Sequence, residues 1–385
     1  MEVLWYLTGP DGRYPWRPDG ARELSYAYFQ QLARAVDHLG FTGALLATGS
    51  HDAWVQGSSL IPYTENFQHL IAAHPPMLSP TLLAKMMTTF DHFSKGRLRV
   101  NIVNGDAKLM AQSGVHLKHD ERYAYTDEFL TVLTGLLRGE SVTFKGKFIH
   151  VVDAGLPLAP YQKSGIPLWF GGSSEAAHEV AAKHIDTYLS WGETPEQTES
   201  KIRHVKSLAA KYGRADKIRF GVRLYVIVRE TEEAAWAAAQ DLYDHMDERA
   251  IAGAQAYVAG IDSIGQQRMS ALHGGRKPAD LRELEIAPNL WSGIGLVRHG
   301  PGTALVGSAK QVLSRLDDYR SVGTDVFIVS GMPLLEEAYR FAELVLPHLP
   351  VTRSTEQGIT SAWTSQRDAG WRESVAERPQ VKVER

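Results

Sequence analysis

Residues 168–177 combine features that suit the binding of a phosphate group. A short apolar run leads into Gly171 and Gly172, and two serines then precede a run of helix-forming residues. Ser173 or Ser174 is a favourable helix N-cap, and the unpaired amides at a helix N-terminus attract anions. Glycine lets the backbone approach a ligand closely. We therefore predict a phosphate seat at Gly172, Ser173 and Ser174, with an ordinary strand-to-helix turn as the alternative.

Two arginines are candidates for binding a second anion. Arg223 lies inside a strongly apolar strand, where a buried guanidinium needs a partner, so it forms either a structural ion pair or an anion site. Arg298 lies between an apolar run and a Gly-Pro loop, and taken alone it is either a surface residue or an anion ligand. Tyr225 shares the strand face of Arg223 and either hydrogen-bonds a ligand or packs in the core. A guanidinium fork can bind two oxygens of a tetrahedral anion.

Histidines offer proton chemistry near neutral pH. His51 and His74 each follow an expected strand, and each serves either as an acid or base or as a polar rim residue. No H-E-x-x-H or similar spacing occurs among the 15 histidines, and the chain has no cysteine. We therefore expect no metal site, no disulfide and no cysteine nucleophile.

The composition sets broader bounds on function. The chain has 385 residues, 44% of them hydrophobic and 22% charged, which is typical of a globular protein. A net charge of −3 gives no sign of a basic face for nucleic acid. No apolar run is long enough to cross a membrane, and the first residues lack the basic region of a signal peptide. We expect a cytoplasmic protein that binds neither nucleic acid nor membranes.

Eight short apolar runs that alternate with helical patterns must position these residues. The expected strands are residues 3–7, 43–47, 67–73, 98–103, 167–170, 187–190, 218–228 and 325–329. Strands that are apolar on both faces suit a parallel sheet covered by helices, so the pattern predicts a (β/α)8 TIM barrel with insertions. A doubly wound sheet is the runner-up, but no G-x-G-x-x-G follows the first run. The carboxyl ends of the barrel strands would present Thr8, Thr48, His74, Asn104, Gly172, Trp191, Tyr225 and Ser330.

The domain organisation follows from the same pattern. Residues 1–350 are expected to form one barrel domain, and residues 142–151 a small hairpin outside the repeat. Residues 247–305 interrupt the alternation and are rich in Ala, Gly, Arg and His. We interpret them as an insertion with some helix that closes over the barrel mouth as a lid. Residues 351–385 are polar and aperiodic, as in an extended or mobile tail.

Several blocks of the sequence resemble the alkanesulfonate monooxygenase group of the bacterial-luciferase-like flavin monooxygenases. The similarity spans roughly residues 2–350, and its main blocks are residues 48–54, 120–123, 169–174, 189–193, 218–224, 288–291 and 295–298. The resemblance implies a luciferase-type (β/α)8 barrel and a homodimer or homotetramer. It also implies reduced FMN supplied by a separate NAD(P)H-dependent flavin reductase, with dioxygen as cosubstrate. The expected reaction converts an organosulfonate to an aldehyde and sulfite.

The resemblance also assigns roles at matching positions. Ser173 and Ser174 would hold the FMN phosphate with Tyr123 nearby, while Thr48 and Asn104 would line the isoalloxazine face. Arg223 and Arg298 match the arginines that serve the sulfonate and the oxygen adduct of the flavin. Trp191 matches a tryptophan of the substrate pocket.

Other positions depart from the family pattern. The cysteine that usually follows Thr-Gly is absent, and His51 lies in this shorter segment. His74 replaces an arginine, Tyr225 replaces a histidine, and Met332 and Leu334 replace a tyrosine and a histidine, leaving only apolar wall. These changes imply retained flavin chemistry with a changed substrate or altered proton handling. The alternatives are a flavin monooxygenase for a sulfone or carbonyl compound, and a catalytically impaired flavin-binding protein.

Overall fold

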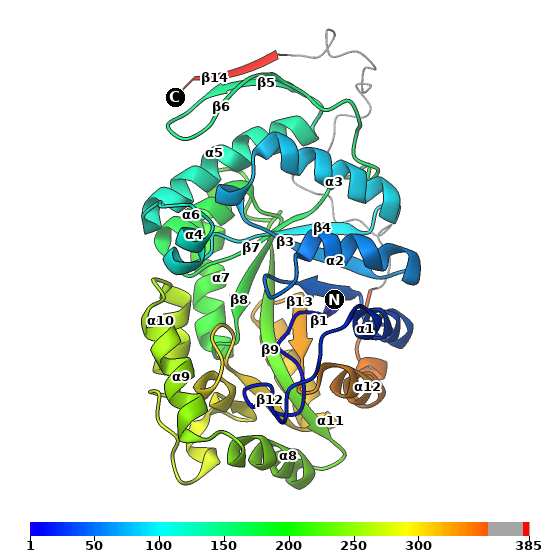
Figure 1. The fold of residues 1–385 in the computed structure, drawn as a ribbon, viewed down its shortest axis with the longest axis vertical. Helices are drawn as coiled ribbons and strands as arrows, with labels where there is room; N and C mark the ends of the chain where they lie inside the picture. The colour runs from blue at the N-terminus through cyan, green and yellow to red at the C-terminus, as the bar shows by residue number, and fades with distance from the viewer. Residues whose placement is uncertain (353–379, 385) are drawn as a thin grey trace.

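A closed barrel of parallel strands lies at the centre of the computed structural model, which describes residues 1–352 and 380–384 (Figure 1). Within those residues the barrel has eight strands, in the order β9-β13-β1-β2-β3-β4-β7-β8, and β8 pairs back with β9 to close it. They are β1 (Glu2–Tyr6), β2 (Gly43–Leu46), β3 (Gln68–Ala73), β4 (Leu98–Ile102), β7 (Leu168–Gly171), β8 (Thr187–Trp191), β9 (Arg219–Arg229) and β13 (Val326–Ser330). Each matches one of the eight runs expected from the sequence, so the predicted (β/α)8 barrel is confirmed.

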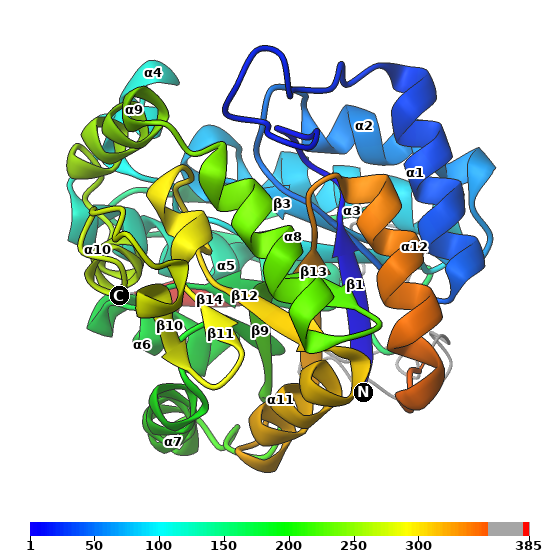
Figure 2. The same ribbon diagram turned by 90° about the horizontal axis from the view of Figure 1, so that it is seen from below.

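Helices surround the barrel and cover the outer faces of the strands (Figure 2). Those that follow barrel strands are α1 (Tyr26–Leu39), α2 (Ala53–Leu60), α3 (Pro80–Ser94), α5 (His119–Leu137), α6 (Glu175–His184), α7 (Pro195–Ala210), α8 (Glu232–Asp244) and α12 (Leu334–Leu344). Several of these helices begin after a residue whose side chain caps them. Ser79, Ser174 and Thr194 each accept a hydrogen bond from the amide three residues later. Because helices cover one face and the barrel core the other, β1, β3 and β4 are buried along their whole length.

A buried charge cluster closes the amino-terminal end of the barrel. Glu2 begins β1 and accepts hydrogen bonds from Arg99 at 2.5 Å and from Arg219 at 3.2 Å. Burial alone would raise the pKa of Glu2, but the two guanidinium groups outweigh burial and the pKa is lowered. This cluster is structural, and the opposite end of the barrel is left to form the site.

The expected insertion, residues 247–305, contains more regular structure than its composition suggested. It holds α9 (Glu248–Ala259), α10 (Ile264–Ala271), β10 (Glu285–Ala287) and β11 (Leu290–Trp291), and it leads into β12 (Ala304–Ser308). β12 runs parallel to the second half of β9 and precedes α11 (Ala309–Ser321). β12 was not predicted, because this short strand lies directly against the helix that Ser308 caps. Nor was α4 (Ala107–Gln112), which is too short to show a clear helical period.

A small second sheet lies outside the barrel, beside α5 (Figure 1). The hairpin expected at residues 142–151 is present as β5 (Ser141–Lys145) and β6 (His150–Ala154). β14 (Gln380–Glu384) pairs in parallel with β5, so this part of the expected tail joins a sheet. The rest of the tail prediction, residues 353–379 and 385, lies outside the described residues. Among the described residues, no helix has both the length and the apolar character needed to cross a bilayer.

Candidate active site

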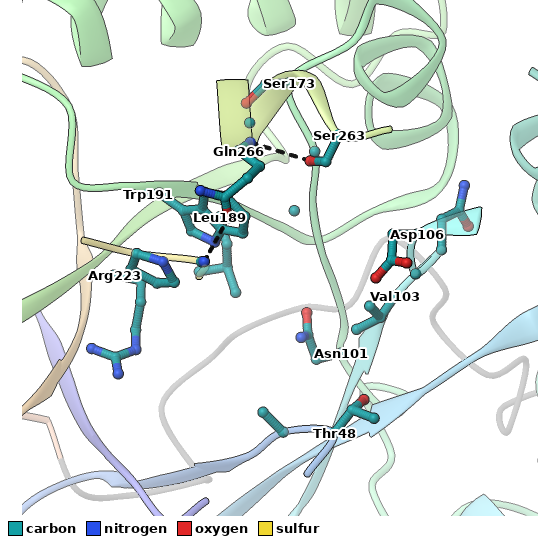
Figure 3. Close-up of a pocket in the computed structure, with 18 of the residues that line it drawn as sticks. Thr48, Asn101, Val103, Asp106, Ser173, Leu189, Trp191, Arg223, Ser263 and Gln266 are labelled. Atoms are coloured by element: carbon teal, nitrogen blue, oxygen red, sulfur yellow. Dashed lines mark hydrogen bonds between the residues drawn. The ribbon is translucent and has the colours of Figure 1, made fainter. Parts of the chain in front are cut away.

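A cavity of about 340 Å³ opens at the carboxyl ends of the barrel strands (Figure 3). This is the end at which sequence analysis placed the site. Ten of the predicted site residues line the cavity: Thr48, His74, Asn104, Tyr123, Gly172, Ser173, Ser174, Trp191, Arg223 and Arg298. The fold therefore brings together side chains that are as much as 250 positions apart in the sequence, from Thr48 to Arg298 (298 − 48).

Four other predicted residues lie outside the lining of this cavity. His51 is exposed and its ring packs edge-on against Phe29, with ring centroids 5.2 Å apart. Leu334 is buried in the core at the start of α12, and Met332 lines a second cavity that is formed mainly by residues of β9, α8 and α12. Both positions differ from expectation because β13 ends at Ser330 and the chain then turns outward into α12. Tyr225 is buried behind the arginines and does not form part of the cavity wall.

The predicted phosphate seat has the expected local structure. Ser174 is the N-cap of α6, and its hydroxyl accepts a hydrogen bond from the amide of Ala177 at 3.2 Å. A Cβ atom at Gly172 would lie only 2.6 Å from the Cβ of Ala177, so the turn requires glycine there. The hydroxyl of Tyr188 donates a hydrogen bond to the carbonyl oxygen of Gly172 and fixes the turn. The free amides and hydroxyls of this turn can therefore hold an anion.

A buried lysine beside this seat was not found by sequence analysis. Lys201 of α7 donates a hydrogen bond to the hydroxyl of Ser173 at 3.4 Å. Its ammonium group also lies 2.9 Å from a carboxylate oxygen of Glu193, and both side chains are buried. Burial lowers the pKa of Lys201, although Glu193 opposes that effect. Lys201 lies within a polar helix pattern and has no motif of its own, so only the packing of α7 against α6 shows its role.

The wall formed by β3 and β4 carries buried polar atoms without partners. Nδ1 of His74, Oδ1 of Asn101 and Nδ2 of Asn104 have no hydrogen-bond partner among the described residues. Thr126 donates to Oδ1 of Asn104 at 2.6 Å, and Thr48 is 2.5 Å from Nε2 of His74. Burial lowers the pKa of His74, so its ring is neutral at pH 7. Buried polar atoms require partners, and a planar ligand rich in nitrogen and oxygen would supply them.

Two guanidinium groups meet on another side of the cavity. Arg223 donates to the carbonyl of Leu224 at 2.6 Å and to Ser330 at 2.8 Å, while Arg298 makes one long hydrogen bond, 3.4 Å, to the hydroxyl of Tyr6. In the described part of the chain, neither has a carboxylate oxygen within 4.0 Å. The structural ion pair considered for Arg223 is therefore absent among these residues.

Two tyrosine rings hold the arginines in place. The guanidinium carbon of Arg223 lies 4.5 Å from the ring centre of Tyr6 and 4.8 Å from that of Tyr225. The corresponding distances from Arg298 are 5.6 and 5.5 Å. Cation–π contacts of this kind partly compensate the buried charges. Sequence analysis missed Tyr6, which lies at the end of β1 within an uninterrupted apolar run.

A family model described as luciferase-like monooxygenase matches residues 5–326. The chain belongs to the luciferase-like monooxygenase family. The structure is also similar to riboflavin lyase, with a TM-score of 0.74, 19% identity, and coverage of 99% of this chain and 97% of that chain. That structure contains modified FMN and the substrate riboflavin.

Two further solved structures resemble this luciferase-like monooxygenase over almost its full length. Long-chain alkane monooxygenase matches with a TM-score of 0.72 and 18% identity, covering 100% of this chain and 97% of that chain. EDTA monooxygenase from Chelativorans sp. BNC1 matches with a TM-score of 0.68 and 17% identity, covering 96% and 97%. At such identities the likeness establishes the fold, and the family establishes flavin-dependent monooxygenase chemistry in general. The names of these proteins cover different substrates, so the substrate must be argued from the site.

The insertion of this luciferase-like monooxygenase forms the remaining wall. A Cβ atom on Gly265 would lie 3.3 Å from the ring of Trp191 and 3.5 Å from the hydroxyl of Ser173, so α10 packs directly over the phosphate seat. Asp262, in the loop before α10, accepts hydrogen bonds from Arg122 at 2.8 Å and from the amide of Ala107 at 2.9 Å. Burial opposes ionisation of Asp262, but these donors outweigh it and lower its pKa. The loop is thus held in place by the buried Arg122 and by the backbone amide of Ala107.

Proposed function

We propose that this protein is a two-component monooxygenase that uses reduced FMN and dioxygen to oxidise an organosulfonate. In the overall reaction, sulfonate, dioxygen and reduced FMN give aldehyde, hydrogen sulfite, oxidised FMN and water. One oxygen atom enters the substrate carbon, whose bond to sulfur breaks, and the other leaves as water. A separate NAD(P)H-dependent flavin reductase would supply the reduced FMN.

The observation that carries this proposal is the pair of guanidinium groups in the cavity. Among the described residues neither Arg223 nor Arg298 forms an ion pair with a carboxylate within 4.0 Å, and their hydrogen bonds go to neutral groups. A buried positive charge on Arg223 beside a half-buried one on Arg298 is costly without a counter-ion in contact, so the cavity favours an anionic substrate. A sulfonate stays ionised at all working pH values, and a guanidinium can bind two of its oxygens.

The residues of the cavity also fit FMN. The phosphate would bind at Gly172, Ser173 and Ser174, where the α6 amides provide positive potential and Lys201 orients the hydroxyl of Ser173. The partnerless polar atoms of Asn101 and Asn104 would face the ring system. When bound, reduced FMN supplies two electrons for the activation of dioxygen.

The residues of the chain would bind the sulfonate, orient it and shield it from water. Arg223 is fixed by Leu224 and Ser330 and would hold the sulfonate in a constant place. Trp191 lies opposite Arg223 in the register of β8 and β9 and forms the wall beside it. The loop that Arg122 holds at Asp262 would shield the cavity from water, and shielding of this kind protects oxygen-activating chemistry from side reactions.

Product analysis with the complete two-component system tests this proposal. The purified chain, FMN, NADH and a flavin reductase would be supplied with sulfonates of increasing chain length, and with a sulfone and a ketone of similar size. Sulfite release that depends on the sulfonate supports the proposal. An oxygenated sulfone or an ester from the ketone would favour a non-sulfonate monooxygenase instead. Hydrogen peroxide as the sole product would indicate a catalytically impaired flavin-binding protein.

A further inference from the structure

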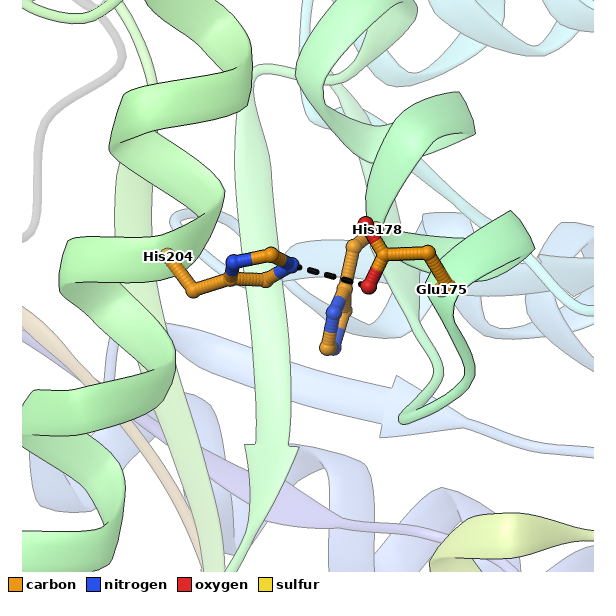
Figure 4. Close-up of side chains that lie close together, drawn as sticks. All are labelled: Glu175, His178 and His204. Atoms are coloured by element: carbon orange, nitrogen blue, oxygen red, sulfur yellow. Dashed lines mark hydrogen bonds and ion pairs between the residues drawn. The ribbon is translucent and has the colours of Figure 1, made fainter.

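Three side chains next to the phosphate seat form a group outside the cavity (Figure 4). Glu175 and His178 lie one turn apart on α6, and His204 projects toward them from α7. Nε2 of His204 lies 3.0 Å from a carboxylate oxygen of Glu175. One ligand atom from each residue lies within 4.8 Å of the others.

No hydrogen bond among the described residues compensates the burial of the polar His178 ring. The side chain is 6% exposed, and neither of its ring nitrogens has a hydrogen-bond partner among the described residues. Its ring contacts are edge-on, with Tyr188 at 5.8 Å and His204 at 5.1 Å between centroids. Burial, followed by the nearby charges of His204 and Lys201, lowers the pKa of His178 to about 4. The imidazole is therefore neutral at pH 7 and keeps a lone pair for a ligand.

We infer that Glu175, His178 and His204 bind a divalent transition-metal cation of the Zn²⁺ type. Two imidazoles and one carboxylate are a donor set that suits Zn²⁺. Bonds of about 2.0–2.1 Å place tetrahedral ligand atoms roughly 3.3 Å apart, so a small rotation of the side chains completes the geometry. The exposed Glu175 and half-exposed His204 leave a path for the ion and a position for water.

Nearby positive charges do not oppose the ion strongly. Lys201 and Arg268 are the other cations that act on His178, and both pair with Glu193, at 2.9 and 3.6 Å respectively. This site could not be predicted from the sequence, because its ligands come from two helices and follow no contiguous zinc motif. The expectation that the chain has no metal site rested on such motifs alone.

The bound ion would join the two helices that build the phosphate seat. Glu175 directly follows the N-cap Ser174, and His204 lies one turn beyond Lys201 on α7. A bridge at this place therefore fixes α6 relative to α7, and with them the hydroxyls and the ammonium group around the seat. The metal is assigned a positioning role and has no part in the proposed oxidation.

Metal titration of the full chain tests this inference without any activity measurement. Zn²⁺ would be titrated into the protein in a buffer that does not chelate metals, with heat release and melting temperature as readouts. Co²⁺ would report a tetrahedral site by its visible absorption. Variants H204Q and E175Q change exposed or half-exposed ligands and should fold, while H178Q changes the buried one. H348Q, in an exposed segment after α12, is the matched control.

The wild type and H348Q should each bind one Zn²⁺ and melt at a higher temperature with the ion. H204Q should bind at least about 100-fold more weakly, because even residues that only support a metal ligand are worth about 10–100-fold in affinity. Equal Zn²⁺ binding by the wild type and H204Q would overturn the inference. So would the absence of one-to-one binding by the wild type.

Discussion

Replacing Arg298 by alanine removes the more weakly held of the two cavity cations. Arg298 makes one hydrogen bond, at 3.4 Å, to the hydroxyl of Tyr6, and its guanidinium lies near the rings of Tyr6 and Tyr225. Each ring contact contributes about 0.5–1 kcal/mol. Relief from the repulsion of Arg223 offsets part of that loss. We therefore expect a small change in melting temperature for R298A.

The effect on turnover should be much larger. A bidentate, charge-assisted contact to a desolvated anion contributes roughly 3 kcal/mol or more. Since each 1.36 kcal/mol corresponds to about tenfold in rate, kcat/KM for a sulfonate should fall by about 100-fold or more. R298K should recover only part of this loss, because an ammonium group lacks the planar fork. R223A should differ by also lowering stability, since the guanidinium of Arg223 is buried and bound to Leu224 and Ser330.

The assay compares sulfite release, FMN affinity and melting temperature for the wild type, R298A and R298K. R276A is a matched control, because Arg276 is an exposed arginine of the same insertion. R298A should keep its FMN affinity and lose turnover, and R276A should keep both. Normal sulfite release by R298A would refute the assignment of Arg298 to the substrate anion and would leave Arg223 as the only cavity arginine that could bind the sulfonate among the described residues.

Three other expected outcomes follow from the structure. Replacing Ser173 and Ser174 together by alanine should weaken FMN binding by about 1–3 kcal/mol in a flavin titration, while riboflavin, which has no phosphate, should bind as before. R122A should speed hydrogen exchange around Asp262 and raise the amount of hydrogen peroxide formed per flavin oxidised. Unchanged exchange there would show that Arg122 does not hold this loop in place. E2Q should cost about 3 kcal/mol in urea unfolding near pH 7. Folding lowers the pKa of Glu2, so the stability that its carboxylate contributes is fully present above its unfolded pKa of about 4.3. That stability is lost as the pH falls through the folded pKa. The difference in unfolding free energy between the wild type and E2Q should therefore vanish in acid.

Local sequence signals were sufficient wherever structure depends on neighbouring residues. The eight apolar runs, the cap at Ser174 and the glycine at position 172 follow from strand burial, capping and close packing, and all three are present. The direction that the chain takes after a strand could not be predicted from such local signals. Met332 was expected at the cavity because it follows a barrel strand, yet the chain turns outward after Ser330.

Residues that act through packing between distant elements could not be found from the sequence. Lys201 approaches Ser173 only because α7 packs beside α6, and Asp262 meets Arg122 only because the insertion folds back over the barrel. Neither interaction leaves a periodic or contiguous pattern. Tyr6 is hidden in the same way, since an aromatic residue at a strand end looks like core until the arginines beside it are located.

A single-turnover experiment would show whether this protein couples flavin oxidation to the cleavage of a sulfonate. The chain loaded with reduced FMN and a sulfonate would be mixed with dissolved dioxygen, and sulfite and hydrogen peroxide would be measured against the flavin oxidised. We expect close to one sulfite per flavin, with little peroxide, and a shift from sulfite to peroxide in R298A. Close to one peroxide per flavin and no sulfite, for every sulfonate that binds, would contradict it.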